Sequence, residues 1–218
     1  MTNPLRIVHY GHACVLVETG SARLLFDPGV FSTGFEELRD LDAILITHQH
    51  ADHIDVERLP ALVAANPGAT LVADPATAAE QIAALNLEVN VARTGESHTL
   101  GGASVHVVGG EHAVIHPDHQ PPPNMGYVID GGRFYHPGDS LFVPEEKIDV
   151  LGLPAGAPWL KTAEGVDFQR AVVPRVSVPI HEKTLSEVGQ QLTWGMYTRM
   201  APEGTEFRVL NHGAPAEL

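Results

Sequence analysis

The chain has 218 residues, of which 44% are hydrophobic and 18% are charged. This composition is typical of a folded domain and excludes an intrinsically disordered chain. The formal net charge of −14, from 27 acidic and 13 basic residues, is opposite in sign to the basic surfaces that bind phosphate backbones. We therefore expect a single domain spanning residues 1–218 that does not bind nucleic acid.

Two features of the sequence bear on location. The segment Met1–Arg6 leads into a strand-like run and lacks the parts of a secretory signal, and every apolar stretch stops well short of a membrane span of ~18 residues. The single cysteine, Cys14, cannot form an intrachain disulfide, which is usual for proteins of a reducing compartment. These features predict a cytoplasmic protein with no membrane association.

The first half of the chain is predicted to alternate strands with helices. Runs rich in Val, Ile and Leu, bounded by Gly, Pro or Asp, predict strands at 6–10, 13–18, 23–27 and 42–47. Apolar residues at helical spacing from Val56 to Val63 predict a helix that ends at Asn66. A strand, a helix and a strand are predicted next, at 70–73, 75–85 and 88–92.

The second half predicts two hairpins followed by a further alternation. The β pattern covers 97–108 and 125–136, and the His- and Pro-rich stretch 109–124 between them predicts a long loop over a site. The remaining strands and helices alternate at 149–153, 162–173, 175–180, 185–200 and 206–210.

Two inferences about packing follow from this order. Helices that recur after groups of strands predict two sheets stacked face to face with helices outside, which is an α+β sandwich of four layers. The last helix carries one apolar stripe that predicts packing against a sheet, formed by Leu185, Val188, Leu192, Met196 and Met200.

The strongest chemical signal is the motif His48-x-His50-x-Asp52-His53, which follows an apolar strand and precedes a helix. In a chain of this composition the pattern arises by chance roughly once in 400 sequences. His48 and His50 point to the same side of an extended segment, so both imidazoles can reach one metal ion. Asp52 and His53, displaced as the chain turns, can serve a second ion.

Two ions need further ligands, and later strand ends supply candidates in His112, Asp139 and His181. Each is a weak signal alone, because a lone histidine after a strand is about as often satisfied by local hydrogen bonds. In this order, however, Asp139 can bridge two cations while His112 and His181 complete one site each. The loop also offers His116, but His112 is favoured because it lies just after a strand.

Several segments together resemble the metallo-β-lactamase superfamily, in particular the branch related to L-ascorbate-6-phosphate lactonase and the phospholipase-D-like members. The resemblance spans residue 7 to about 211 and rests on Gly11-His12-Ala13-Cys14, Phe26-Asp27-Pro28, His48-x-His50-x-Asp52-His53, His112, Gly138-Asp139 and His181. It implies an αβ/βα sandwich with a two-metal centre at one edge between the sheets. By this resemblance the first ion is held by His48, His50 and His112, the second by Asp52, His53 and His181, and Asp139 bridges them.

Three further residues are placed near the centre as pocket or supporting residues, His12, Asp27 and His116. His12 either lines the pocket or shapes a turn, and Asp27 is expected to orient a metal-bound histidine. Cys14 lies in the early strand region, which excludes a second site of the kind that uses a cysteine ligand.

The resulting hypothesis is a metal-dependent hydrolase. Two divalent ions, zinc first with manganese or iron as alternatives, would share a hydroxide that attacks an ester, lactone, amide or phosphodiester of a small molecule. Asp52 or Asp139 would hold this nucleophile. The alternative is a non-hydrolytic metal protein on the same fold, either an iron oxidoreductase or a metal-binding module. The resemblance permits monomers and homo-oligomers and does not specify the substrate.

Overall fold

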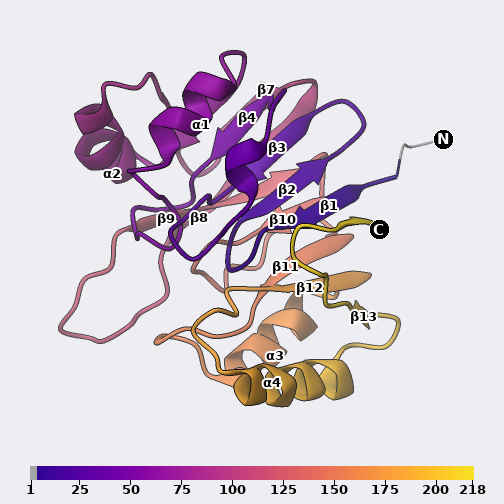
Figure 1. Cartoon of the computed structure of the whole chain (residues 1–218). Helices are drawn as coiled ribbons and strands as arrows, with labels where there is room; N and C mark the ends of the chain where they lie inside the picture. The colour runs from indigo at the N-terminus through magenta and orange to yellow at the C-terminus, as the bar shows by residue number, and fades with distance from the viewer. Residues whose placement is uncertain (1–3) are drawn as a thin grey trace.

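Two seven-stranded sheets form the centre of the computed structural model, which describes residues 4–218 (Figure 1). The first sheet has the order β14 (Pro215–Glu217), β1 (Arg6–His9), β2 (Val15–Glu18), β3 (Arg23–Phe26), β4 (Ala43–Leu45), β5 (Thr70–Ala73) and β6 (Asn90–Val91). The second has the order β13 (Glu206–Phe207), β12 (Val176–Ile180), β11 (Val150–Pro154), β10 (Phe134–His136), β9 (Pro123–Ile129), β8 (Ala103–Glu111) and β7 (Ser97–Leu100). Of the segment used to predict location, Met1–Asn3 lies outside the described residues.

The two sheets are built alike, with antiparallel strands first and parallel strands afterwards. Strands β1 to β3 and β7 to β10 pair antiparallel, whereas β3 to β6 and β10 to β13 pair parallel. Parallel neighbours need long crossover connections. The helical segments that provide most of these crossovers are α1 (Leu59–Ala65), α2 (Pro75–Thr77) with η2 (Ala78–Ile82) and η3 (Ala83–Leu85), α3 (Thr162–Val172) and α4 (Glu187–Met200). A short η1 (Phe35–Glu37) follows β3.

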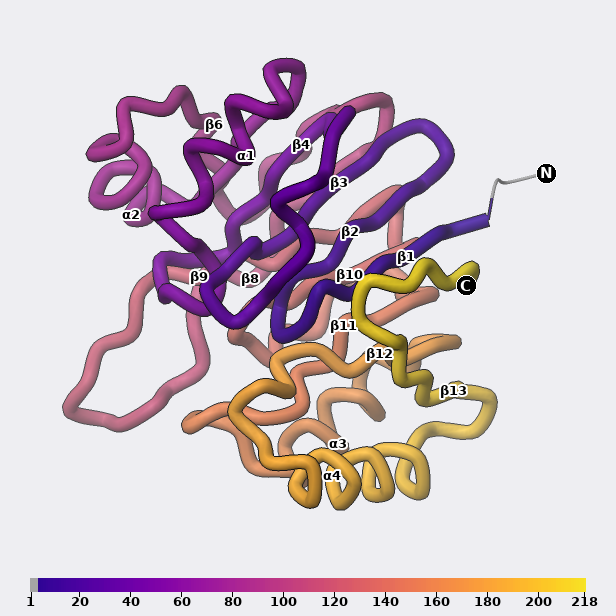
Figure 2. Tube along the Cα trace, in the orientation of Figure 1, coloured from indigo at the N-terminus to yellow at the C-terminus, as the bar shows by residue number. Residues whose placement is uncertain are grey.

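Alternation along the strands divides the buried side chains among three layers of core. In β2, Val15 and Val17 face the second sheet, while Leu16 faces the outer helices, as the two-residue period of a strand requires. The helices α1 and α2 lie outside the first sheet, and α3 and α4 lie outside the second (Figure 2). The predicted four-layer sandwich is therefore confirmed.

The helices differ in detail from their predicted forms. The α1 helix begins at Leu59, because the carboxylate of Asp55 accepts hydrogen bonds from the amides of Glu57 and Arg58 and forms a capping turn over the predicted start. The helical stretch 75–85 is preceded by Asp74, whose side chain caps it by accepting hydrogen bonds from the amides of residues 76 and 77. Among residues 4–218 no helix combines the length and apolar character needed to cross a bilayer.

The loop predicted at 109–124 is shorter, and one strand was not predicted. Strand β8 continues to Glu111, which pairs with Pro123 at the start of β9, so the loop outside these strands is 112–122. At the C-terminal end β14 pairs antiparallel with β1 and places Arg6 opposite Glu217. The first and the last strand of the chain therefore lie side by side in the first sheet, and the described chain starts and ends at the same edge (Figure 1).

The prediction that the apolar stripe of α4 packs on a sheet is wrong for the middle of the stripe. Val188 and Leu192 are 67% and 68% exposed, and the buried residues of the helix are Thr193 and Tyr197. The Tyr197 hydroxyl donates to the carbonyl of Pro154 at 2.8 Å, passing Gly165 of α3, where an added Cβ would lie 1.9 Å from that hydroxyl oxygen. The contact between Tyr197 and the backbone of Pro154 thus sets the rotation of α4, which leaves Val188 and Leu192 in solvent while Met200 packs against the core outside the second sheet.

Candidate metal centre

The motif from His48 to His53 is held at the edge of the first sheet by the neighbouring strand. Strands β3 and β4 run parallel, so their carboxyl ends meet at the same edge. Asp27, directly after β3, accepts hydrogen bonds from the Thr47 amide at 2.8 Å, the Thr47 hydroxyl at 2.7 Å and His53 Nδ1 at 2.7 Å. Asp27 therefore folds the motif back onto β3 and fixes the ring of His53.

The second sheet brings three more side chains to this edge. His112 follows β8, Asp139 follows β10, and His181 follows β12. The amide of His181 donates to the carbonyl of His12 at 2.9 Å, which joins the turn between β1 and β2 to the end of β12. His12, Asp27 and His181 have φ values of 55°, 44° and 62°, so three of these turns use the left-handed region that glycine usually occupies.

One group of ligand atoms comes from both sheets. Its ligand atoms lie within 4.8 Å of one another, and its members are His48, His50, His112 and Asp139. His112 Nε2 lies 3.3 Å from Asp139 Oδ2, and His48 Nε2 lies 4.0 Å from the same oxygen. All are buried except His50, which is half-buried. We call these four residues the first group.

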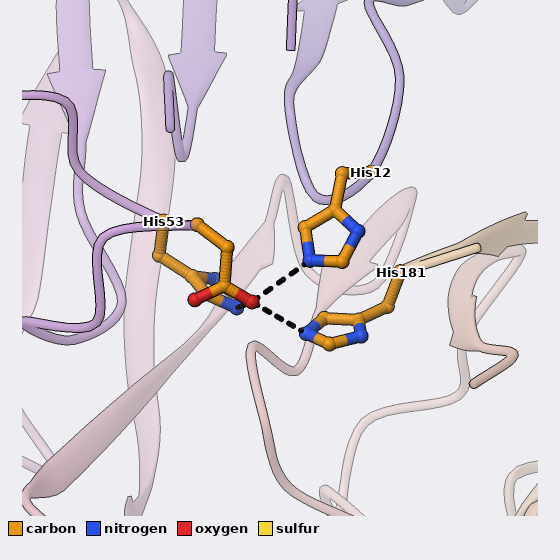
Figure 3. A group of neighbouring side chains, drawn as sticks. His12, His53 and His181 are labelled. Carbon is orange, nitrogen blue, oxygen red and sulfur yellow. Dashed lines mark hydrogen bonds and ion pairs between the residues drawn. The ribbon is translucent and has the colours of Figure 1, made fainter. Parts of the chain in front are cut away.

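A second group lies beside it and is formed by His12, Asp52, His53 and His181. Figure 3 shows His12, His53 and His181 converging from three separate segments. Their Nε2 atoms lie 2.9 Å, 3.9 Å and 3.4 Å, respectively, from one oxygen of Asp52, Oδ2. His12 thus belongs to a ligand-like cluster as well as to a turn.

Asp139 faces both groups with different oxygens. Its Oδ1 lies 3.0 Å from His53 Nε2 and 3.1 Å from His181 Nε2, while its Oδ2 faces His112 of the first group. A carboxylate placed in this way can bind one cation through each oxygen. Asp139 therefore lies between the two groups, and the bridging role that the resemblance implies for it stays a prediction.

The donor atoms suit metal ions because their lone pairs point toward one another. His53, His112 and His181 each donate through Nδ1, to Asp27, to the Ala113 carbonyl and to the Gly156 carbonyl, so in each neutral ring Nε2 is left as an acceptor. Among the described residues these three Nε2 atoms and Asp139 Oδ1 are buried and make no hydrogen bond of acceptable geometry. Lone pairs and carboxylate oxygens in such proximity are stabilised by a cation between them.

The pKa values of these side chains, without a bound metal, also show that the centre favours positive charge. Burial alone would lower the pKa of His181, yet the carboxylates of Asp139 and Asp52 raise it to about 9. Burial is likewise outweighed at His53, where Asp139 and Asp27 raise the pKa well above its ordinary value. For Asp139 the neighbouring histidines overcome burial and hold the pKa well below its usual range. Protons thus occupy positions that a divalent ion would take.

The structure brings together all seven of the predicted ligands, and it places the supporting residues unequally. Asp27 contacts His53, and His12 lies in the second group. His116 lies on the loop with 65% of its side chain exposed, and its Nδ1 accepts from the Asp118 amide. Cys14 is a buried member of the core beneath the outer helices. The choice of His112 over His116 agrees with this geometry.

For Trp159, sequence reasoning favoured core or surface packing over a place in the site. Its indole Nε1–H donates to Asp139 Oδ2 at 2.8 Å, and its ring is buried. A buried indole needs an acceptor for its N–H, but the sequence alone does not say which acceptor. The segment between β11 and α3 carries this tryptophan to the carboxylate that both groups share.

Hollows in the surface lie beside the first group. One of about 500 Å³ is lined by His112, Ser140 and Phe142, and another of about 350 Å³ is lined by His50, Glu80 and the prolines Pro121–Pro123. These volumes suit small organic molecules. The proline-rich part of the loop therefore walls the approach to His50, as the sequence suggested.

The sandwich of two sheets with histidine and aspartate groups at one edge defines a metal-dependent enzyme of the metallo-β-lactamase fold. A family model described as a β-lactamase superfamily domain matches residues 6–181, and the chain belongs to this superfamily as a metal-dependent hydrolase. The protein Rv0786c of Mycobacterium tuberculosis is 47% identical over 210 residues, covering 94% of this chain and 96% of the relative. A UPF0173 metal-dependent hydrolase of Geobacillus is 25% identical and covers 98% of this chain and all of its own (100%).

Solved structures agree on the fold and differ in chemistry. The metallo-β-lactamase fold protein YhfI from Bacillus subtilis has a TM-score of 0.76 at 17% identity, covering 98% of this chain and 99% of its own. CmlA, a diiron β-hydroxylase from Streptomyces venezuelae, has a TM-score of 0.74 at 17% identity, covering 100% of this chain and 55% of its own. The fold therefore does not by itself specify the metal or the reaction.

Proposed function

We propose that this hydrolase uses a centre of two divalent metal ions to cleave an ester, lactone, amide or phosphodiester bond of a small molecule. The observation that carries the proposal is the position of Asp139, whose two oxygens face two separate groups of ligand atoms. One ion would need only one of these groups. The second group would then leave buried nitrogen atoms without partners.

Each ion would take its ligands from one of the two groups, with His12 as a supporting residue of the second. His48, His50 and His112 would hold one ion with Asp139 Oδ2, and Asp52, His53 and His181 would hold the other with Asp139 Oδ1. When bound, the two ions would lower the pKa of a water toward neutrality and polarise the substrate oxygen. Zinc suits this set of imidazole and carboxylate donors, and manganese and iron are alternatives.

The chain's own residues orient these donors. Asp27 accepts the Nδ1 proton of His53, which keeps Nε2 of that ring turned toward the centre. His12 donates through Nε2 to Asp52 at 2.9 Å, and the part-buried Asp52 carboxylate can orient the attacking water by accepting a hydrogen bond from it. The Trp159 N–H fixes the angle of Asp139. Hydrogen bonds from the protein thus orient His53, Asp52 and Asp139 toward the centre.

Cavity size and charge favour a small substrate. The hollows beside His50 and His112 measure about 350 Å³ and about 500 Å³, and the net charge of −14 opposes polyanions such as nucleic acid. We extend the proposal to a cytoplasmic location, for which the support is that the single cysteine, Cys14, is free and buried. Assembly into a homo-oligomer is compatible with the proposal and is not required by it.

The first experiment measures metal content per chain by elemental mass spectrometry, followed by a panel of ester, lactone, amide and phosphodiester substrates. The wild type should hold the two ions that its ligand groups accommodate and should cleave at least one class. A His48→Ala/Asp139→Ala variant should lose the two ions of this centre and the hydrolysis, while Asp118→Asn, which changes an exposed loop carboxylate, should keep both.

Each alternative result has a defined meaning. Iron with a charge-transfer absorption band and no hydrolysis would favour the oxidoreductase alternative. Bound metal with neither hydrolysis nor redox activity would favour a metal-binding module. Metal content unchanged in the double variant would contradict the assignment of His48 and Asp139.

A further inference from the structure

Among the described residues a further cluster of metal-ligating side chains lies apart from the two groups, formed by His9, Glu182 and His212. Its ligand atoms lie within 4.8 Å of one another. His9 is the last residue of β1, Glu182 follows His181 beyond β12, and His212 lies in the loop before β14. Three distant parts of the chain therefore meet at this point.

Glu182 is the buried anionic member of the cluster. Its side chain is 5% exposed. Oε1 accepts from the His12 amide at 3.0 Å and lies 3.2 Å from His212 Nε2. Within residues 4–218, Oε2 has no hydrogen-bond partner, although His9 Nε2 lies 3.7 Å away. A buried carboxylate oxygen without a partner is costly, so this atom indicates a ligand that completes the cluster.

His9 can turn to such a ligand without leaving another buried group unsatisfied. Its Nε2 donates to the carbonyl oxygen of His12 at 2.8 Å. That carbonyl also accepts from the amide of His181 at 2.9 Å, so it keeps one hydrogen bond when His9 is withdrawn. The buried His9 ring is then free to offer a nitrogen lone pair.

His212 gives the cluster its access to solvent. Its side chain is 41% exposed, whereas those of His9 and Glu182 are buried. The rings of His9 and His212 meet edge to face, with centroids 4.8 Å apart. An ion can therefore reach the cluster from the surface without passing the two groups at the strand ends.

We propose that His9, Glu182 and His212 form a further metal site that binds one divalent transition-metal ion, with zinc as the best fit. Two imidazoles and one carboxylate are a donor set that zinc accepts, and the exposed side leaves a position for water. Since Glu182 also holds the His12 amide, an ion here would brace the turn that carries His12. The site does not depend on the proposed hydrolysis.

The test is zinc stoichiometry of the full chain after equilibrium dialysis, with His212→Ala as the main variant. Because His212 is at the surface, this variant should fold, and it should bind about one zinc fewer per chain than the wild type. His98→Ala is the matched control, since His98 lies outside the three ligand clusters and its ion-pair partner is Glu96, at 3.7 Å. This variant should bind as much zinc as the wild type.

A second variant separates this site from the main centre. The His48→Ala/Asp139→Ala protein should still bind about one zinc, and adding His212→Ala should remove it. Zinc should also raise the melting temperature of the double variant and not of the triple variant. Equal zinc content and affinity in wild type and His212→Ala would overturn the proposal, whatever the substrate panel shows.

Discussion

The two ligand groups differ in how firmly the protein holds them before a metal arrives. In the second group His53 is fixed by the buried carboxylate of Asp27, and His181 by the Gly156 carbonyl. In the first group His50 is half-buried, and its Nδ1 lies 3.0 Å from another ligand atom, Nε2 of His48. The second group is thus the more firmly preorganised, and His50 is the ligand of the first group that can adapt. We expect the second ion to bind more tightly and the first to exchange more readily.

The largest effect is expected for Asp139→Asn, because this substitution removes the carboxylate that faces both groups. The amide cannot neutralise two cations, so both ions should be lost. Activity should fall by more than the roughly 100-fold loss that follows mutation of a residue hydrogen-bonded to a metal ligand. Metal analysis and single-turnover hydrolysis measure this. A variant that keeps one ion at wild-type affinity would show that Asp139 serves only one group.

Asp27→Asn should weaken the second ion selectively. The amide keeps the shape of Asp27 but not the charge that makes His53 a stronger donor, so the affinity of that ion should fall about 10- to 100-fold. Competition with a chromophoric chelator resolves the two affinities. Equal weakening of both ions would contradict the distinction between the groups.

The pH dependence of metal binding should also separate the groups. The pKa of His181 is raised to about 9 in the metal-free protein, so protons compete with the second ion below that pH. Burial lowers the pKa of His48 well below its ordinary value, so this ligand is already deprotonated at neutral pH. Affinity for the second ion should therefore rise more steeply from about pH 6 to about pH 9 than affinity for the first. Chelator competition across this range provides the measurement, and parallel curves would count against the assignment.

Trp159→Phe should produce a smaller loss. Phenylalanine retains most of the buried ring but removes the N–H that donates to Asp139 Oδ2. Affinity for the first ion should fall about tenfold, and that for the second should change less, because Oδ1 keeps its surroundings. Trp194→Phe is the control, because Trp194 lies on α4 and packs against the core outside the second sheet; it should leave both affinities unchanged.

The smallest effect is expected for His116→Ala. Its side chain is 65% exposed, so metal content and activity should remain at wild-type values. His112→Ala should instead lose the first ion. If both substitutions had the same effect, the loop would have to rearrange on metal binding.

Local patterns were sufficient to predict the motif and most strands, because a strand and the residues at its end are encoded by neighbours in sequence. The predicted ligands His112, Asp139 and His181 follow β8, β10 and β12. These strands run in one direction, because β8 and β10 both pair antiparallel with β9, and β10 to β12 pair parallel. Because the ends of these strands meet at one edge of the sheet, three residues that are weak signals singly could be predicted to form one site.

Features that depend on contacts between distant segments were not predictable in the same way. Trp159 contacts Asp139 only because the segment after β11 crosses the site. The rotation of α4 depends on Tyr197 and a gap at Gly165, and β14 exists because the C-terminal segment returns to β1. Helical periodicity describes the amphipathic face of one helix, but the partner's shape decides which face is buried.

The left-handed turns at His12, Asp27 and His181 have a consequence for attempts to make the protein more stable. Each side chain at such a φ costs about 1–2 kcal/mol relative to a relaxed backbone. Glycine at any of the three would relieve that cost while deleting a metal-facing or supporting group. Selection for thermostability alone would therefore tend to erode the centre, and the three turns should be held constant in any library built on this scaffold.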